Sequence, residues 1–200
     1  MNNDDKFNDV TGVILAGGRS TRMGRDKAML RVGEDGGVTL FERLLELMQA
    51  LFPKIIIAGD RPDLCQIQLP CYPDRYPGSA LGGLYTGLFE ANSEMIFVSP
   101  CDLAFPDPKL ARLILAQRRD YDVVVPKTPA GIEPLFALYR KSCLEHMRNM
   151  LERSEYRIYD FFPQVRVRYM GVEELPSDWQ WSLMNINTPE DYCRMKERNL

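Results

Sequence analysis

Short apolar runs alternate with longer segments of helical periodicity along the first two-thirds of the chain. The apolar runs carry little charge and are bounded by glycine, proline and aspartate, which is typical of buried strands. Strands are expected over residues 10–16, 54–59, 69–74, 94–102 and 121–126. Near-continuous apolar strands that alternate with helices belong to parallel sheets covered on both faces. The pattern therefore predicts a doubly wound α/β fold with a mostly parallel, Rossmann-like sheet.

The segments between these strands carry helical signals. Thr39 precedes an apolar run and Glu42 follows three residues later, which is the signature of a capping box. Leu40, Leu44 and Leu51 then fall on one helical face. Further helices are expected over residues 61–67, 78–91 and 107–118.

The last third of the chain changes character. We expect a strand over residues 133–140, an amphipathic helix over 142–151, a half-exposed strand over 164–170 and a final helix over 188–198. Trp179 and Trp181 alternate with polar residues, which favours an edge strand that packs one tryptophan over a ring that stacks on a ligand. No linker or repeat interrupts the sequence. We therefore expect one domain over residues 1–200, in which the last third extends the same sheet and residues 1–9 form a flexible tail.

Composition narrows the classes of protein to consider. The chain has 200 residues, 45% of them hydrophobic and 26% charged, and its net charge is −3, which excludes a broad basic surface for nucleic acid. Five cysteines without a CxxC pair argue against a disulfide framework and a structural zinc site, and favour reduced thiols. The polar, acidic start is not a signal peptide, and no apolar run reaches membrane-spanning length. We expect a soluble cytoplasmic protein with no nucleic-acid or membrane partner.

Positive charge gathers in one glycine-rich loop, LAGGRSTRMGRDK, which follows the first expected strand. A strand that turns toward a helix through glycines leaves backbone N–H groups that can bind an anion. Gly17 and Gly18 have no side chain to block a ligand, and Arg22 and Lys27 can supply the cations that a triphosphate needs. The loop matches neither the P-loop nor the dinucleotide fingerprint. A solvated basic loop that caps a helix is the alternative.

One carboxylate lies at a position where it could bind a metal ion. Asp102 ends the strand expected over residues 94–102, and ligands of open α/β sheets bind at the carboxyl ends of the strands. Mg²⁺ prefers a few carboxylates together with substrate phosphates, so Asp102 is a candidate metal ligand. The alternative is a loop aspartate that bonds to nearby backbone.

The segment NINTPEDY near the C-terminus is only partly explained by local structure. Thr188 suits a helix cap, Pro189 the first helical position and Asp191 the first turn. Asn185 and Asn187 lie two apart on an extended segment and therefore face the same side. Turn-forming asparagines explain one of these residues better than both.

These motifs together resemble one family. LAGGRSTRMGRDKAML, YPDRYPGSALGGLYTGL, FVSPCDLAF, EPLFALY and NINTPEDY occur in this order and span nearly the whole chain. They resemble nucleotidyltransferases that activate sugars and cofactors, and the first motif is most similar to the form found in molybdenum cofactor guanylyltransferases. The first and last motifs are specific, whereas the middle ones are shared more widely. The resemblance implies that the terminal phosphate of molybdenum-loaded molybdopterin attacks the α-phosphate of GTP and that pyrophosphate leaves.

The resemblance also implies roles for individual residues, with Mg²⁺ as the cofactor. Arg22 would hold the pyrophosphate, Lys27 would neutralise charge at the α-phosphate, and Asp102 would hold the metal; these three form the catalytic set. The implied nucleotide-binding residues are Leu15, Ala16, Gly17, Gly18, Lys27, Asp60, Asp74 and Asp102, and the implied acceptor-binding residues are Gly78, Gly82, Asn185 and Asn187.

One position departs from the family pattern. The family often carries a guanine-reading asparagine after the second strand, and the matching position here is Asp60. A carboxylate accepts hydrogen bonds from guanine N1–H and from the exocyclic amine, so guanine recognition can survive the change. A helix cap is an equal alternative for Asp60, and a turn residue is the competing explanation for Asp74.

Other functions stay open beside the guanylyltransferase. A relative could use CTP or a different phosphate acceptor, or the chain could be a catalytically silent module that holds the cofactor for a partner. A dinucleotide-binding oxidoreductase fits poorly because its fingerprint is absent. Because a molybdenum cofactor is unstable in the open, the resemblance also implies a transient hand-off to cofactor-insertion or cofactor-accepting proteins.

Overall fold

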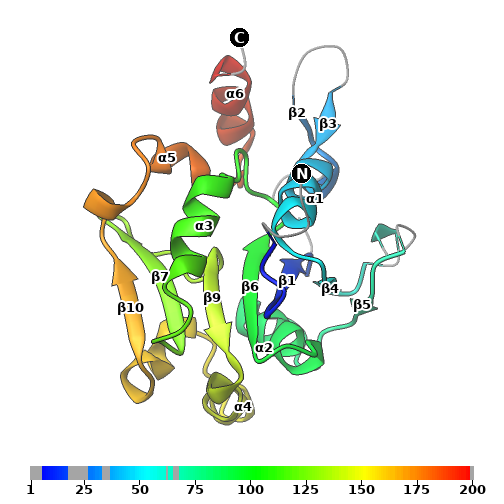
Figure 1. The fold of residues 1–200 in the computed structure, drawn as a ribbon. Helices are drawn as coiled ribbons and strands as arrows, with labels where there is room; N and C mark the ends of the chain where they lie inside the picture. Colours follow the sequence, from blue (N-terminus) through cyan, green and yellow to red (C-terminus); the bar gives the residue numbers. More distant parts are fainter. Residues whose placement is uncertain (1–5, 18–26, 33–36, 62, 65–67, 199–200) are drawn as a thin grey trace.

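A computed structural model of the protein describes residues 6–17, 27–32, 37–61, 63–64 and 68–198. Its centre is an eight-stranded sheet in the order β10-β7-β9-β6-β1-β4-β5, in which β8 pairs with β7 (Figure 1). The strands are β1 (Val10–Leu15), β4 (Ile55–Ala58), β5 (Cys71–Tyr72), β6 (Met95–Pro100), β7 (Val123–Thr128), β8 (Gly131–Ile132), β9 (Ala137–Arg140) and β10 (Val167–Met170).

The sheet is mixed but mostly parallel, as the apolar pattern predicts. β1 pairs in parallel with β4 and β6, β4 with β5, and β7 with β10. The antiparallel strands are β8, which pairs with β7, and β9, which pairs with both β6 and β7. β9 follows β7 through the short hairpin that contains β8, and so short a connection cannot carry a crossover to a parallel strand.

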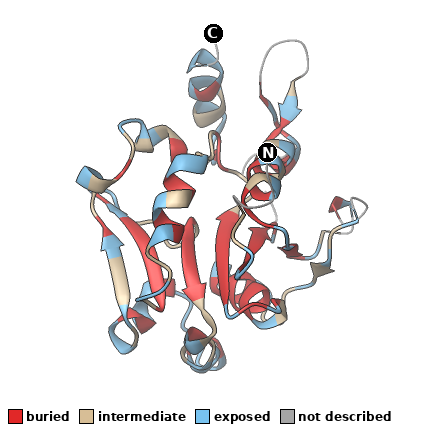
Figure 2. Ribbon diagram, in the orientation of Figure 1, coloured by how far each residue is buried: buried red, intermediate tan, exposed pale blue. Residues whose placement is uncertain are grey.

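Helices cover both faces of the sheet, so the doubly wound class is confirmed. Side chains of α1 (Leu40–Leu51) and α3 (Pro108–Ala116) share one core cluster with Ile14 of β1, whereas α2 (Ala80–Glu90) and α4 (Leu144–Glu152) pack with Val13 on the opposite face. Neighbouring β1 residues face opposite sides because side chains alternate along a strand. In Figure 2 the strands β1, β6, β9 and β7 form the buried centre of the molecule.

The remaining elements are short or lie at the ends. A small hairpin of β2 (Arg31–Val32) and β3 (Val38–Thr39) precedes α1. The capping box at α1 is confirmed, because Glu42 N donates to Thr39 Oγ1 over 3.1 Å and Thr39 N donates to Glu42 Oε2 over 2.7 Å. The single-turn 3₁₀ helices are η2 (Lys27–Met29), η4 (Lys141–Cys143) and η6 (Val172–Glu174); η5 (Ile158–Gln164) is longer, and α5 (Trp179–Ser182) and α6 (Pro189–Arg198) follow.

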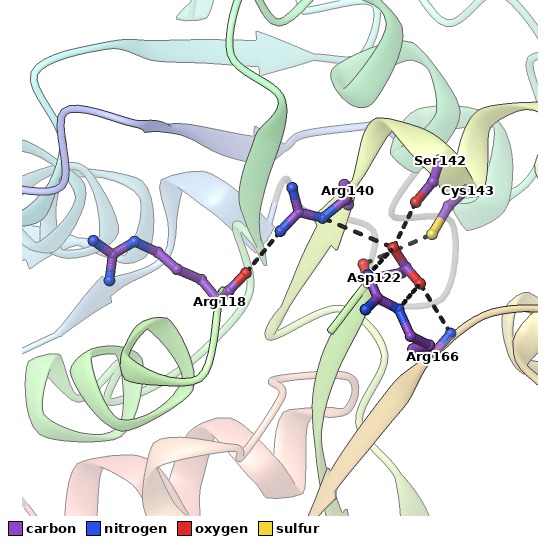
Figure 3. Close-up of polar contacts among 6 residues, drawn as sticks. All are labelled: Arg118, Asp122, Arg140, Ser142, Cys143 and Arg166. Carbon is purple, nitrogen blue, oxygen red and sulfur yellow. Dashed lines mark hydrogen bonds and ion pairs between the residues drawn. The ribbon is translucent and has the colours of Figure 1, made fainter. Parts of the chain in front are cut away.

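The last third extends the same sheet, and one buried carboxylate anchors it. Asp122 precedes β7 and is 8% exposed. Its carboxylate accepts hydrogen bonds from Ser142 Oγ over 2.9 Å and from Arg166 Nε over 3.1 Å, and it lies 3.8 Å from Arg140 Nε (Figure 3). These contacts join the start of β7 to the end of β9 and to the segment that enters β10.

The segment that contains Trp179 and Trp181 is a short helix, so the prediction of an edge strand is wrong. Trp181 N donates to the Asp178 carbonyl over 3.0 Å, which closes a turn. The ring of Trp181 lies edge-on to Phe105, with centroids 5.9 Å apart, and Arg198 stacks on it at 4.4 Å. Gln180 is exposed and Ser182 is buried, so the polar neighbours belong to a helical turn rather than to the alternation of a strand.

Two further expectations need correction. Part of the expected tail is packed, because Phe7 N donates to Leu51 O over 2.9 Å and its ring lies 6.4 Å from that of Phe52; residues 1–5 lie outside the described residues. Cys71 is disulfide-bonded, so the expectation of reduced thiols is wrong at this position. An odd cysteine count excludes complete pairing but not a single bridge. Cys101, Cys143 and Cys193 are not in disulfide bonds.

The helix expected over residues 61–67 lies mostly outside the described residues. Among the helices that the structure describes, none combines the length and apolar character needed to cross a lipid bilayer.

Candidate active site

Four parallel strands bring the predicted site residues to one edge of the sheet. β1, β4, β5 and β6 run in the same direction, so their carboxyl ends meet at the same edge (Figure 1). Gly17, Asp60, Asp74 and Asp102 each follow one of these strands within a few residues. This edge is where open α/β sheets bind their ligands.

The residues at the end of β1 are mostly buried at this edge of the sheet. Leu15 and Ala16 are buried, and their backbone is already engaged: Cys101 N donates to Leu15 O over 3.1 Å, and Ala16 N donates to Ala58 O over 2.9 Å. Gly17 is exposed. Of these three residues, Gly17 is therefore the most accessible to a ligand.

Gly17 packs closely against Gly59 and Asp74, which the sequence did not reveal. A Cβ atom on Gly17 would lie 2.9 Å from Asp74 Oδ2, and one on Gly59 would lie 2.5 Å from Gly17 N. Gly59 also has a φ of +139°, a conformation that favours glycine. Gly17 lets the loop after β1 approach the Asp74 carboxylate, and Gly59 lets the loop after β4 approach Gly17.

Asp74 is an under-satisfied carboxylate. Its Oδ1 atom is buried and has no hydrogen-bond partner among the residues that the structure describes. Burial raises the pKa of Asp74, and the nearby charge of Asp60 raises it further. Buried polar atoms are normally paired, so an unpaired oxygen here suits a ligand that brings an N–H or O–H donor. Asp60 itself is exposed.

Lys27, Asp102 and Asn187 meet at the same edge. Lys27 Nζ donates to Asn187 Oδ1 over 2.6 Å and lies 3.5 Å from Asp102 Oδ2. The Lys27 and Asp102 side chains are only 18% and 21% exposed. Burial raises the pKa of Asp102, and the ion pair and hydrogen bond with Lys27 oppose that shift.

The C-terminal segment is bonded directly to the Asp102 loop. Ile186 N donates to Asp102 O over 2.9 Å, and Leu103 and Asn185 form an antiparallel bridge. The helix cap expected at Thr188 is present, because Asp191 N donates to Thr188 Oγ1 over 3.1 Å. Two segments that are far apart in sequence thus share one set of backbone hydrogen bonds beside the site.

The two glycines assigned to the acceptor differ in their surroundings. Gly82 is buried, and a Cβ atom there would lie 1.8 Å from the Tyr76 carbonyl oxygen, so packing alone explains this glycine. Gly78 is exposed, has a φ of +98° and has open space around its α-carbon. The acceptor role of both glycines stays a prediction.

Two predicted site residues, Gly18 and Arg22, lie outside the described residues. Glu133, in contrast, was missed by the sequence analysis. It follows the β8 hairpin, where its N–H donates to Pro126 O over 3.0 Å, and burial raises the pKa of its carboxyl. Because β9 begins where β6 and β7 end, Glu133 belongs to the same sheet edge. A glutamate before proline inside an apolar run was the available signal.

The residues present fit a hard divalent cation. Within the described residues, no group of three or more His, Cys, Asp or Glu side chains could form a complete metal cage. Mg²⁺ needs no such cage, because it uses one or two carboxylates and takes further ligands from water and phosphates. Asp102 already faces a cation, the ammonium group of Lys27, which shows that its half-buried carboxylate can accept positive charge.

Comparison with known proteins identifies the family of the chain. Residues 12–167 match the family described as the MobA-like NTP transferase domain. A probable molybdenum cofactor guanylyltransferase from Carboxydothermus hydrogenoformans is 35% identical over 94% of this chain and 95% of that protein.

Solved structures share the fold. Molybdopterin-guanine dinucleotide biosynthesis protein A from Archaeoglobus fulgidus superposes with a TM-score of 0.80 at 22% identity, over 94% of this chain and 98% of that chain. A Mycobacterium tuberculosis protein solved as a complex with manganese gives a TM-score of 0.65 at 18% identity, over 95% of this chain and 98% of that chain. The fold, the matched residues and the near-complete coverage by a relative of this identity place the chain in the family of MobA-like nucleotidyltransferases.

Proposed function

We propose that the protein transfers GMP from GTP to the terminal phosphate of molybdenum-loaded molybdopterin, with release of pyrophosphate. The observation that carries the proposal is the assembly of Lys27, Asp102 and Asn187 on the carboxyl edge beside Gly17. Relatives that match nearly the full length of the chain bear the guanylyltransferase name. The reaction joins two polyanions, so it needs cations and positioning more than it needs a covalent nucleophile on the protein.

The nucleotide would lie across the ends of β1, β4 and β5. Asp74 would accept a hydrogen bond on its unpaired oxygen, and Asp60 would accept from guanine N1–H or from the exocyclic amine. Leu15, Ala16 and Gly17 would form the floor beneath the nucleotide. Gly18 would add its backbone to the phosphate site.

The phosphates would lie beside the basic loop and Lys27. Lys27 would donate to the α-phosphate and neutralise the charge that develops there, and Arg22 would hold the pyrophosphate. Asp102 would hold Mg²⁺, which supplies charge neutralisation at the phosphates when bound. Asn185 and Asn187, with Gly78 and Gly82, would face the molybdopterin acceptor.

The setting of the reaction follows from its chemistry. Molybdopterin loaded with molybdenum is unstable in free solution, so we infer a transient hand-off to a cofactor-insertion or cofactor-accepting protein. From a biosynthetic role of this kind we infer a cytoplasmic location.

A CTP-dependent relative is the second candidate, and Asp60 is the observation that keeps it open. Guanine offers two adjacent N–H donors on its Watson–Crick edge, whereas cytosine offers one donor beside an acceptor. Two carboxylates, Asp60 and Asp74, match guanine better. A silent binding module is disfavoured because Lys27 and Asp102 are both retained and in contact.

Calorimetry of nucleotide binding tests the proposal. GTP, CTP and ATP would each be titrated into the protein with Mg²⁺, with Lys27→Ala as the test variant and Lys54→Ala, an exposed lysine before β4, as the matched control. We expect a preference for GTP that Lys27→Ala weakens and Lys54→Ala leaves intact. A preference for CTP would move the assignment to the cytidylyl relative, and no binding of any of the three nucleotides would contradict the enzyme assignment.

A further inference from the structure

Two described side chains contact the Lys27 ammonium group, and the nearer of the two is neutral. Lys27 Nζ lies 2.6 Å from Asn187 Oδ1 but 3.5 Å from the carboxylate of Asp102. The shorter distance is that of a strong hydrogen bond, and the longer one is at the limit of a direct bond. The geometry therefore gives the amide of Asn187 a larger part in orienting Lys27 than the charge of Asp102.

Asn187 is itself fixed from both sides. Asp191 Oδ2 accepts hydrogen bonds from Asn187 N and Thr188 N, each over 2.9 Å. On the other side, Ile186 N donates to the Asp102 carbonyl over 2.9 Å. The α6 cap and this backbone bond together set the distance between Asn187 and the Asp102 loop.

We propose that Asn187 is a positioning residue for Lys27, whose amide oxygen aims the ammonium group at the nucleotide phosphates. This inference rests on the proposed function and refines it, because it assigns Asn187 to the nucleotide half of the reaction as well as to the acceptor. The cap formed by Thr188 and Asp191 becomes the support of that residue.

A neutral acceptor suits this task better than a carboxylate. Asp102 is the residue proposed to hold the metal, and positive charge bound there would weaken its pairing with Lys27. The Asn187 oxygen is unaffected by that competition. An ammonium group has three N–H donors, so Lys27 can keep its bond to Asn187 and still donate to a phosphate.

Positioning of Lys27 and contact with the acceptor are two different roles for Asn187, and they predict different effects on nucleotide binding. Loss of the bond to Asn187 removes one constraint on the flexible four-carbon stem of Lys27, so more of its order must be supplied when the triphosphate binds. Removing this bond should therefore weaken nucleotide binding even when no molybdopterin is present. A residue that only contacts the acceptor would leave nucleotide binding unchanged.

A double-mutant cycle with acceptor-free calorimetry tests this inference. GTP with Mg²⁺ would be titrated into wild type, Asn187→Ala, Lys27→Ala and the double variant, with Asn149→Ala on the exposed face of α4 as the matched control. A hydrogen bond to a charged group leads us to expect GTP affinity about tenfold or more weaker in Asn187→Ala. The double variant should bind no more weakly than Lys27→Ala, because Asn187 acts through the lysine.

A second variant tests the support of Asn187. Asp191→Ala should weaken GTP binding in the same direction but by less than Asn187→Ala. Thermal unfolding midpoints of all variants, measured in parallel, check that each is folded. Asn187→Ala that binds GTP as wild type does, or a double variant whose losses multiply, would overturn the inference alone. Wild type that binds no nucleoside triphosphate would overturn the proposed function and this inference together.

Discussion

At the scale of single residues, Asp74 lowers the stability of the folded protein but is suited to bind a ligand. Its Oδ1 atom is buried and finds no partner within the described part of the chain, and burial together with the charge of Asp60 raises its pKa. The folded protein thus disfavours the ionised form of Asp74 that a hydrogen-bonding nucleotide would use. An unfavourable charge state of this kind is expected where residues are placed for a ligand rather than for the fold.

Replacement of Asp74 by asparagine should therefore stabilise the protein and weaken nucleotide binding. Because the folded-state pKa is raised, wild type loses stability as pH rises through that pKa, and Asp74→Asn should be the more stable protein at pH 7. The advantage should vanish below the unfolded aspartate pKa of about 3.9. GTP affinity should fall about tenfold, because a hydrogen bond to a charged group is lost.

Chemical denaturation at several pH values and calorimetry with GTP measure these two effects. A variant that is less stable than wild type at pH 7 would contradict the description of Asp74 as an under-satisfied carboxylate. An unchanged GTP affinity would remove Asp74 from the nucleotide site.

At the scale of elements, Asp122 fastens the last third of the chain to the sheet (Figure 3). Burial alone would raise the pKa of Asp122, but hydrogen bonds from Arg166 and Ser142 outweigh burial and lower it. The stabilisation from a lowered pKa is present above the unfolded aspartate pKa of about 3.9 and is lost as pH falls through the folded-state pKa.

Asp122→Ala should lower the free energy of unfolding by about 2 kcal/mol at pH 7, because it removes a buried carboxylate that accepts hydrogen bonds from Ser142 and Arg166. The loss should shrink in acid as the wild-type carboxyl becomes protonated. Asp120→Ala, an exposed neighbour, serves as the control and should change stability little. Equal losses at pH 7 and below the folded-state pKa would show that charge pairing is not what Asp122 contributes.

The start of α2 offers a second test at this scale. A Cβ atom on Gly82 would overlap the Tyr76 carbonyl at 1.8 Å, whereas the nearest atom to a Cβ on Gly83 would be 3.5 Å away. Gly82→Ala should lower the free energy of unfolding by about 2–3 kcal/mol because of this overlap. Gly83→Ala should not lower it, because the added Cβ makes only ordinary contacts and alanine favours a helix. Thermal unfolding of both variants measures the difference. Similar stabilities would contradict the packing role of Gly82.

At the scale of the whole molecule, features that depend on neighbours in sequence were predicted well. The Thr39 capping box and the β1 strand follow from residues within one turn or one apolar run, and both are present. The common edge that carries Gly17, Asp74 and Asp102 follows from the rule that parallel strands end together. The family motifs added the chemistry that periodicity alone does not specify.

Features that depend on distant partners were not predictable in the same way. The antiparallel direction of β9 depends on its hairpin, and the packing of Phe7 depends on α1. The contact between Lys27 and Asn187 joins residues 160 positions apart, so their individual motifs gave no sign of it. Gly59 carries its constraint in a backbone angle that its letter alone does not reveal.

The central claim is the transfer of GMP, and product analysis tests it most directly. The protein would be incubated with Mg²⁺, molybdenum-loaded molybdopterin and GTP labelled at the α-phosphate, with CTP in a parallel reaction. We predict that label enters the guanine dinucleotide form of the cofactor, that one pyrophosphate is released per product, and that Lys27→Ala abolishes both. Transfer from CTP in place of GTP, or no labelled product from a protein that binds GTP, would contradict the assignment.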